Sequence, residues 1–266
     1  MFSTGIALLL PLATVVLIPF ARRHANVREG VSLFAALVVF GAAASLLPAV
    51  MAGERPHIEL IEFLPGAGIT FTVEPLGLAF ALISSLLWFV TVVYSIGYMR
   101  AHNERNQTRF YSFFALAIAI TVAAAFAGNL LTLYLLYEAL TLATYPLVTH
   151  GGEDRDRAGG RRYLLILFGT SLTFMLLAMA WTYSIAGTLE FTDGGIFLVD
   201  GQLPDGLGGG LLALLYALFL FGTGKAALVP FHRWLPAAMV APTPVSALLH
   251  AVAVFKLGVI KVLKIT

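Results

Sequence analysis

The sequence predicts an all-α membrane protein that crosses the bilayer about eight times. Of its 266 residues, 59% are hydrophobic and 11% are charged, whereas about a quarter of the residues in a soluble domain are charged. The apolar residues fall in runs of about 18 or more, the length that a helix needs to cross the hydrocarbon core. No polar interval between these runs is long enough to form a soluble domain.

Eight runs qualify as spanning helices. In chain order they cover residues 2–20, 31–52, 75–98, 110–127, 129–149, 163–187, 208–229 and 243–265. The first run has no basic segment before it and no small-residue cleavage site after it, so we interpret it as a retained helix and not as a signal peptide. The fourth and fifth runs are joined only by Gly128 and Asn129, which makes them antiparallel neighbours.

The loops between the spans separate by charge. Eleven of the sixteen basic residues fall in the loops that follow odd-numbered spans. The other loops carry eight acidic residues and one basic residue, Arg55. The positive-inside rule therefore places the N-terminus outside and the arginine-rich loops in the cytoplasm. Lys261 and Lys264, at the outer end of the last span, depart from this pattern and are expected to snorkel to the interface.

The two longer loops on the predicted outer side, residues 53–74 and 188–207, contain segments with high β-propensity. The second loop also contains Asp193-Gly194, a frequent two-residue hairpin turn. We expect the two loops to form a cap outside the membrane.

The seventh span is expected to be broken. Pro230 cannot donate a backbone hydrogen bond and disfavours a helical residue before it, so this helix should end near Val229. Broken helices at membrane depth are tolerated only against protein or water-filled cavities, and they recur at transport sites. Lys225 would lie one turn before the helix end, where the negative end of the helix dipole favours a cation.

Four ionisable residues lie inside apolar runs, namely Glu138, Lys225, His250 and Lys256. A charge at the bilayer centre costs about 2.5–3.5 kcal/mol on insertion scales, and such residues usually mark ion pathways. We predict a proton pathway with Lys225 as a switchable carrier, because a nearby carboxylate such as Glu138 strengthens the hold of a buried lysine on its proton. The alternatives are a permanent Lys225–Glu138 salt bridge that only joins two helices, and a histidine that only packs.

Further polar residues share helix faces with these groups. They are Tyr134, Thr141 and Tyr145 beside Glu138, and Thr243 and Ser246 beside His250. This polar stripe on the fifth span should face protein or water. Lys256 lies about 120° around the helix from His250 and about 9 Å along it, which suits a sideways relay better than a metal site. Because a metal needs three or four converging ligands, we expect no metal.

His150 lies at the cytoplasmic edge of the fifth span and is a candidate proton entrance. We favour the simpler interpretation, that His150 is a solvated loop histidine. The chain has no cysteine, which excludes a thiolate nucleophile, a cysteine-ligated zinc site and an iron–sulfur cluster. We find no nucleotide, haem or flavin motif and no nucleophile–base constellation, so we expect no cofactor and no catalytic chemistry of its own.

Two segments make the sequence recognisable. NLLTLYLLYEALTLATYPLV resembles the fifth helix of the antiporter-like subunits shared by respiratory complex I and Mrp-type multisubunit cation/proton antiporters. GKAALVPFHRWLPAAMVAPTPVSALLHAVAVFKLGV resembles the seventh and eighth helices of the same subunits. The LLHAVAVFK form looks closest to the D-type subunit of Mrp antiporters and its hydrogenase relatives.

The resemblance implies a proton-translocating subunit in which Glu138 tunes Lys225 and the proton then passes laterally through His250 and Lys256. It also implies two inverted five-helix repeats. This chain would supply the first repeat in residues 110–266, after N-terminal helices in residues 1–109. The second repeat is missing from the sequence, so we expect a longer chain or a second chain to complete the path.

The implied function is that of a subunit of a multisubunit Mrp-like Na⁺/H⁺ antiporter in a bacterial inner membrane. Its partners would be other membrane subunits, H⁺, possible Na⁺ and the lipid bilayer, with no nucleic acid. An alternative is the equivalent proton-pumping subunit of complex I or of a membrane-bound hydrogenase, where a redox module drives the pump. A third hypothesis, from another class, is a structural subunit that does not conduct.

Overall fold

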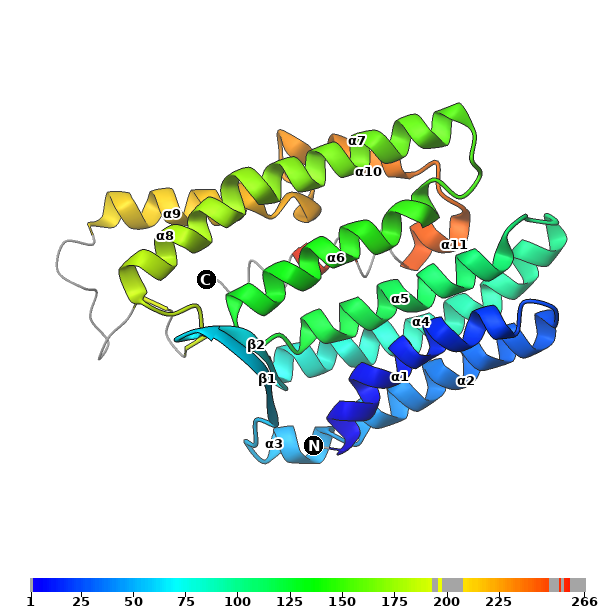
Figure 1. Ribbon diagram of the computed structural model, residues 1–266, viewed down its shortest axis with the longest axis horizontal. Helices are drawn as coiled ribbons and strands as arrows, with labels where there is room; N and C mark the ends of the chain where they lie inside the picture. Colours follow the sequence, from blue (N-terminus) through cyan, green and yellow to red (C-terminus); the bar gives the residue numbers. More distant parts are fainter. Residues whose placement is uncertain (1, 193–195, 198–207, 249–253, 255, 259–266) are drawn as a thin grey trace.

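A computed structural model describes the chain apart from residues 1, 193–195, 198–207, 249–253, 255 and 259–266 (Figure 1). The helices are α1 (Phe2–Phe20), α2 (Ala25–Ala44), α3 (Leu47–Met51), α4 (Pro75–Ala101), α5 (Gln107–Ala125), α6 (Leu130–Val148), α7 (Asp154–Thr170), α8 (Leu176–Ala186), α9 (Gly209–Gly222), α10 (Trp234–Ala238) and α11 (Thr243–Val245). A π-helical segment, Ser171–Met175, joins α7 to α8, and 3₁₀ turns cover Gly224–Ala226 and Phe231–Arg233. Strands β1 (His57–Leu64) and β2 (Ala67–Thr72) pair in antiparallel fashion.

Six helical segments of the described chain are long and apolar enough to cross a membrane. They are Phe2–Phe20, Ala25–Met51, Pro75–Ala101, Gln107–Ala125, Leu130–Val148 and Asp154–Ala186, and they correspond to the first six predicted spans. The seventh predicted span contains α9, a shorter apolar helix. More than half of the eighth, residues 243–265, lies outside the described residues. The chain is therefore an all-α polytopic membrane protein, as predicted.

Two helices begin more than one turn earlier than the hydropathy of the sequence predicts. α2 begins at Ala25 and not at residue 31, and α7 begins at Asp154 and not at residue 163. Charged residues in their first turns lower the hydropathy, but several of them are good helix formers. In α7, the Asp156 carboxylate accepts a hydrogen bond of 3.2 Å from the backbone N–H of Glu153, and acids in a first turn stabilise a helix. Most of the predicted arginine loop is therefore the start of α7.

The hairpin β1–β2 is fixed to the start of α6. The Asn129 side chain accepts a hydrogen bond from the Thr132 backbone N–H at 2.7 Å and donates one to the Gly68 carbonyl oxygen at 2.7 Å. The first bond caps α6, and the second reaches the hairpin. The Thr70 backbone N–H also donates to the Thr132 hydroxyl at 3.0 Å. The β-prone part of residues 53–74 thus forms a two-stranded antiparallel sheet.

The start of the second predicted cap loop lies against the same hairpin. The Leu189 backbone N–H donates to the Gly66 carbonyl oxygen at 2.9 Å, and the Leu130 N–H donates to the Leu189 carbonyl oxygen at 2.9 Å. This loop therefore bridges the hairpin and the start of α6. The predicted Asp193-Gly194 turn lies outside the described residues.

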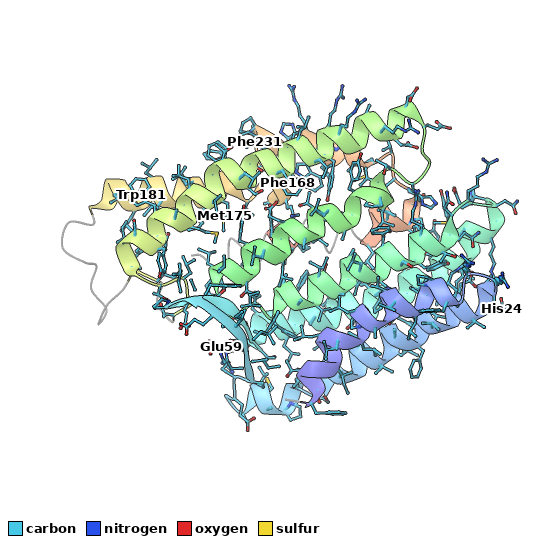
Figure 2. All side chains as sticks on the ribbon, viewed as in Figure 1. His24, Glu59, Phe168, Met175, Trp181 and Phe231 are labelled. Carbon is cyan, nitrogen blue, oxygen red and sulfur yellow. The ribbon has the colours of Figure 1, made fainter. Side chains whose placement is uncertain are left out.

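α6 lies between two groups of helices (Figure 1). On one side α1, α2, α4 and α5 lie together, and on the other side lie α7 to α10. α1 packs against α5, so the helices on either side of the predicted division at residue 109 share one core. His24 and Glu59 lie at opposite ends of the group formed by α1, α2, α4 and α5 (Figure 2), which places the hairpin far from the arginine-rich loop after α1.

Candidate functional site

The seventh predicted span is broken, as expected, but at a different residue. α9 ends at Gly222, and Lys225 lies in the 3₁₀ turn that follows it. The prediction that this helix would reach Val229 is therefore wrong. Ala227 has a φ of +52°, a left-handed conformation that is frequent where helices end. Pro230 lies beyond it in the non-helical stretch, and Lys225 remains close to the negative end of the α9 dipole.

Two glycines bring this turn against the π-helical segment between α7 and α8. A Cβ atom on Gly222 would lie 2.6 Å from the backbone N of Met175, and one on Gly224 would overlap the Thr170 hydroxyl. Met175 is the last residue of the π-helical segment, and Thr170 directly precedes it. Such segments are rare and occur frequently at functional sites. The small residues around Lys225 thus allow it to approach α7 closely.

The Lys225 side chain is fully buried against α6. Its ammonium donates to the Tyr137 carbonyl oxygen and to the Thr141 hydroxyl, the second at 2.7 Å. The Nζ atom also lies 3.2 Å from the centroid of the Tyr137 ring, in a cation–π contact. The Tyr137 hydroxyl in turn accepts a hydrogen bond from the Lys225 backbone N–H at 2.8 Å. We call Tyr137 and Thr141 the lysine cradle. The two hydrogen bonds and the cation–π contact that it makes with the Lys225 ammonium come from neutral groups.

Glu138 lies on the same turn of α6 as the lysine cradle. Its side chain is partly buried, and neither carboxylate oxygen accepts a hydrogen bond from the residues that the structure describes. Glu138 and Lys225 are therefore brought to one turn of one helix without a direct hydrogen bond between them. A buried carboxylate without a hydrogen-bond donor is costly, so this arrangement favours an approach by a proton or a cation.

The rest of the predicted stripe on α6 is partly or fully buried. Tyr134 is buried and Tyr145 is partly buried. The opposite flank of Glu138 carries Leu135 and Leu142, which are 43% and 58% exposed. Glu138 consequently lies at the border between the polar interior and an apolar surface of α6.

A second polar cluster was not predicted from the sequence. The hydroxyls of Thr144 and Tyr163, both fully buried, lie 2.6 Å apart. The Tyr163 ring packs edge-on against Trp234 at 5.7 Å between centroids. The indole Nε1 of Trp234 donates to the Gly224 carbonyl oxygen at 2.7 Å, next to Lys225. In the sequence, Tyr163 and Trp234 look like packing residues. Only the Tyr163 hydroxyl and the Trp234 indole N–H indicate that they could take part in a polar cluster.

The lateral proton path through His250 and Lys256 stays a prediction. His250 lies outside the described residues, so its relay role stays a prediction. Lys256 and Thr243 are exposed on this chain, and Ser246 is partly buried. α11 packs against α4.

His150 lies just beyond the end of α6 and is only 5% exposed, so the favoured interpretation as a solvated histidine is wrong. Neither ring nitrogen makes a hydrogen bond of ordinary geometry with the described residues. Its Nε2 atom lies 3.9 Å from Oε2 of Glu104, and Arg109 donates to its backbone carbonyl oxygen at 3.1 Å. Burial lowers the pKa of His150 and the Arg109 charge adds to this, whereas Glu104 counteracts it.

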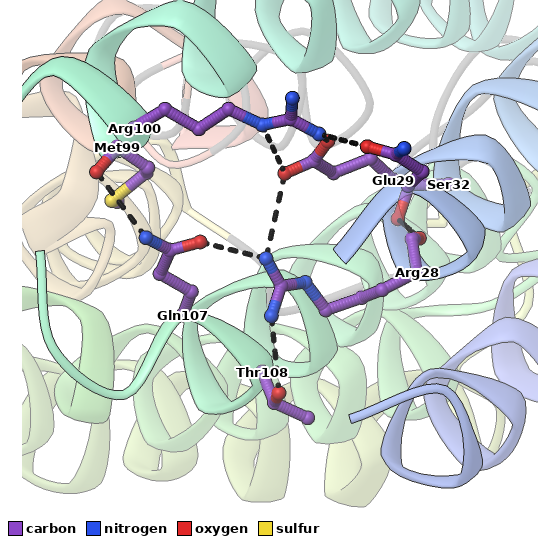
Figure 3. A network of polar contacts seen from close by, with 8 residues as sticks. Arg28, Glu29, Ser32, Met99, Arg100, Gln107 and Thr108 are labelled. Carbon is purple, nitrogen blue, oxygen red and sulfur yellow. Dashed lines mark hydrogen bonds and ion pairs between the residues drawn. The ribbon is translucent and has the colours of Figure 1, made fainter. Parts of the chain in front are cut away.

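Figure 3 shows a partly buried ion network at the start of α2, the end of α4 and the start of α5. Glu29 accepts hydrogen bonds from Arg100, including one from Nε at 3.3 Å, and from Arg28 at 3.4 Å. Arg28 also donates to Gln107 at 2.7 Å and to Thr108 at 3.3 Å. The sequence had suggested only an orienting role for Arg28 and Arg100. Their network with Glu29 joins three helices.

Comparison with known proteins identifies relatives of the chain. A model of the family described as "NADH:quinone oxidoreductase/Mrp antiporter, TM" matches residues 127–266. The A-type subunit of the Na(+)/H(+) antiporter of Alkalihalophilus pseudofirmus is 31% identical over 214 residues, which cover 77% of this chain and 25% of that protein. NADH-quinone oxidoreductase subunit N of Desulforudis audaxviator is 31% identical over 88% of this chain and 45% of its own length.

A solved structure shares the fold. The Mrp complex from Dietzia sp. DQ12-45-1b contains a chain that matches 97% of this one with a TM-score of 0.81 and 24% identity, over 27% of its own length. The chain thus spans between a quarter and a half of the length of these relatives.

Proposed function

Because this chain belongs to the NADH:quinone oxidoreductase/Mrp antiporter transmembrane family, we propose that it translocates protons within a multisubunit Mrp-like Na⁺/H⁺ antiporter. The chain is an antiporter-like, multi-pass membrane subunit. The finer assignment rests on one observation. The fully buried Lys225 ammonium lies on the α6 turn that carries Glu138, whose carboxylate accepts no hydrogen bond from the described residues.

Lys225 is the proposed carrier and Glu138 its modulator. A lysine beside a carboxylate holds its proton more strongly than a lysine among neutral groups. Movement of the ammonium between the lysine cradle and Glu138 would therefore change its proton affinity. The four-carbon stem of lysine is flexible enough for such a movement, and the break after α9 supplies a non-helical hinge.

The remaining steps extend this switch in both directions. His150, buried beside Glu104, is the proposed cytoplasmic entrance, and His250 and Lys256 form the proposed lateral exit. Residues 110–266 would form the proton-translocating repeat and residues 1–109 its N-terminal support. A second half, in the same or another chain, would receive the proton.

The proposed location is a bacterial inner membrane, with the arginine-rich loops in the cytoplasm. The relatives are named as subunits of antiporters and of a quinone oxidoreductase, so we propose that this chain also works with other membrane subunits. The antiporter relative from Alkalihalophilus pseudofirmus is of the A type, and the likeness to a D-type subunit stays a prediction.

Antiport in everted membrane vesicles that contain the whole complex tests the proposal. Lys225→Ala and Glu138→Ala should each lower cation-driven proton movement by about 100-fold, the usual scale for loss of a proton-transfer group. Glu59→Gln, an exposed acid on the hairpin, is the matched control and should keep wild-type antiport. Normal antiport in both Lys225 and Glu138 variants, at wild-type levels of assembled complex, would rule out this site.

The similarity to subunit N favours a redox-driven pump as the second candidate. In that case a reductant such as NADH, and not a cation gradient, would drive proton movement in the same vesicles, and Lys225→Ala would abolish it. A structural subunit predicts the opposite pattern. His250→Ala or Lys256→Ala would then change complex assembly and leave the proton flux per complex unchanged.

A further inference from the structure

Tyr137 touches Lys225 at three points. Its ring lies under the ammonium, its carbonyl oxygen accepts from the ammonium, and its hydroxyl accepts from the Lys225 backbone N–H. Tyr137 itself is fully buried. One residue of α6 thus holds both the side chain and the main chain of Lys225.

The hydroxyl contact has a structural reason. The helix before Lys225 ends at Gly222, and the ends of helices leave backbone groups without helical partners. A buried N–H without an acceptor destabilises the fold. The Tyr137 hydroxyl satisfies the Lys225 N–H and thereby fixes the position of the break relative to α6.

The ring and the carbonyl oxygen of Tyr137 compete with the Glu138 carboxylate for the Lys225 ammonium. Successive residues of an α-helix point about 100° apart, so the lysine cradle and Glu138 are neighbouring positions for one ammonium. Hydrogen bonds between an ammonium and a carboxylate are among the strong ones in proteins. The ammonium nevertheless lies in the cradle, and the carboxylate stays without a hydrogen bond from the described residues. The cation–π contact and the two neutral acceptors therefore balance the attraction of Glu138.

We propose that Tyr137 is a positioning residue that holds protonated Lys225 in a resting position beside Glu138. This inference rests on the proposed function of Lys225 as proton carrier. Tyr137 stabilises the charged amine through its ring and carbonyl and anchors the hinge through its hydroxyl. It thereby sets the pH at which Lys225 releases its proton.

The pH dependence of antiport in vesicles of the whole complex is the test. Tyr137→Leu removes the ring and the hydroxyl, and the neutral amine needs neither. Losing a contact to the charged form alone makes proton release easier, so the midpoint of the antiport profile should move to lower pH by about one unit. Tyr137→Phe keeps the ring and should restore most of the wild-type midpoint.

Tyr111→Phe is the matched control. Tyr111 is also buried, and its hydroxyl makes no hydrogen bond with the residues that the structure describes. This variant should leave the midpoint unchanged. A purely structural role of Tyr137 predicts lower antiport at every pH with the wild-type midpoint, which would overturn the inference.

Failure of this inference is distinguishable from failure of the proposed function. Normal antiport in the Lys225→Ala variant would rule out the proposed function of Lys225 as proton carrier. Loss of antiport with Lys225→Ala, together with a wild-type midpoint in Tyr137→Leu, removes only the role of Tyr137. Should Tyr137→Leu fail to assemble, Thr141→Val removes the other acceptor of the cradle, and it must shift the midpoint in the same direction.

Discussion

His150 is a buried titratable side chain just beyond the end of α6. Its pKa is lowered, chiefly by burial, so the imidazole is neutral near neutral pH. The unfolded chain binds this proton at about pH 6.5, above the pKa in the folded chain. Stability from His150 is therefore fully present above about pH 6.5 and is lost as the pH falls through the lowered pKa.

This gives a prediction for purified complex in detergent. The thermal unfolding midpoint should decrease when the pH is lowered from about 7.5 to about 5.5. His150→Leu should make this decrease smaller, because it removes the titrating group. His102→Leu is the matched control, since His102 is exposed and its removal should not change the slope. Equal slopes in wild type and His150→Leu would contradict the prediction.

Single residues differ in how visible they are in the sequence. Lys225 and Glu138 stand out because a charge in an apolar run is costly and needs a reason. Tyr137 does not, because a tyrosine in an apolar run is usually a packing residue. Its role depends on a contact between residues 88 positions apart, and no local pattern reveals such a contact. Glu29 was missed because it lies among basic loop residues, where an acid looks solvated.

At the scale of elements, the end of α9 depends on two glycines. Gly222 is the last residue of α9, and a Cβ atom there would meet the Met175 backbone at 2.6 Å. Gly222→Ala should therefore destabilise the complex by about 1–3 kcal/mol, the usual cost of overpacking, and should reduce antiport by displacing Lys225. Alanine is otherwise the better helix former.

Gly210→Ala in the same helix is the control. A Cβ atom on Gly210 would meet no atom within 4 Å, so this variant should be neutral or slightly stabilising. Thermal unfolding and antiport of both variants decide the matter. If Gly222→Ala behaved like Gly210→Ala, the close contact with the π-helical segment would not position Lys225.

Hydropathy predicted correctly which segments form the first six spanning helices, but it placed the ends of several helices at the wrong residues. α1 and α6 match their predicted bounds to within a residue, because polar or turn-forming residues flank both. α2 and α7 extend into charged sequence that hydropathy excludes. α9 stops before its predicted end, where Gly222 and Gly224 pack against the π-helical segment and the end of α7. Tertiary packing of this kind is absent from a one-dimensional pattern.

At the scale of the molecule, α6 connects the main features. The hairpin and the cap of Asn129 fix its start, the lysine cradle lies in its middle, and His150 follows its end. The ion network of Arg28, Glu29 and Arg100 lies among the helices on one side. Sequence patterns predicted the membrane class, the order of the first six spans and the β-prone character of residues 53–74, since each depends on local composition. The placement of Lys225 on α6 depended on how the helices pack.

The orientation of the whole molecule is open to a direct test, because the chain has no cysteine. Cysteine introduced at Glu59 or at His24 would be the only thiol in this sequence, and the two positions lie at opposite ends of the group formed by α1, α2, α4 and α5 (Figure 2). Both residues are exposed. The positive-inside rule places the arginine-rich end, with His24, in the cytoplasm.

A membrane-impermeant maleimide should therefore label Glu59→Cys in intact cells and His24→Cys only in everted vesicles. Labelling of both variants after detergent treatment controls for reactivity, and antiport of each confirms that the complex is assembled. The reverse pattern would place the hairpin in the cytoplasm. His150, at the same end of α6 as the arginine-rich loops, would then face the outside and could not serve as the cytoplasmic proton entrance, although the lysine cradle and its predicted pH dependence would be unaffected.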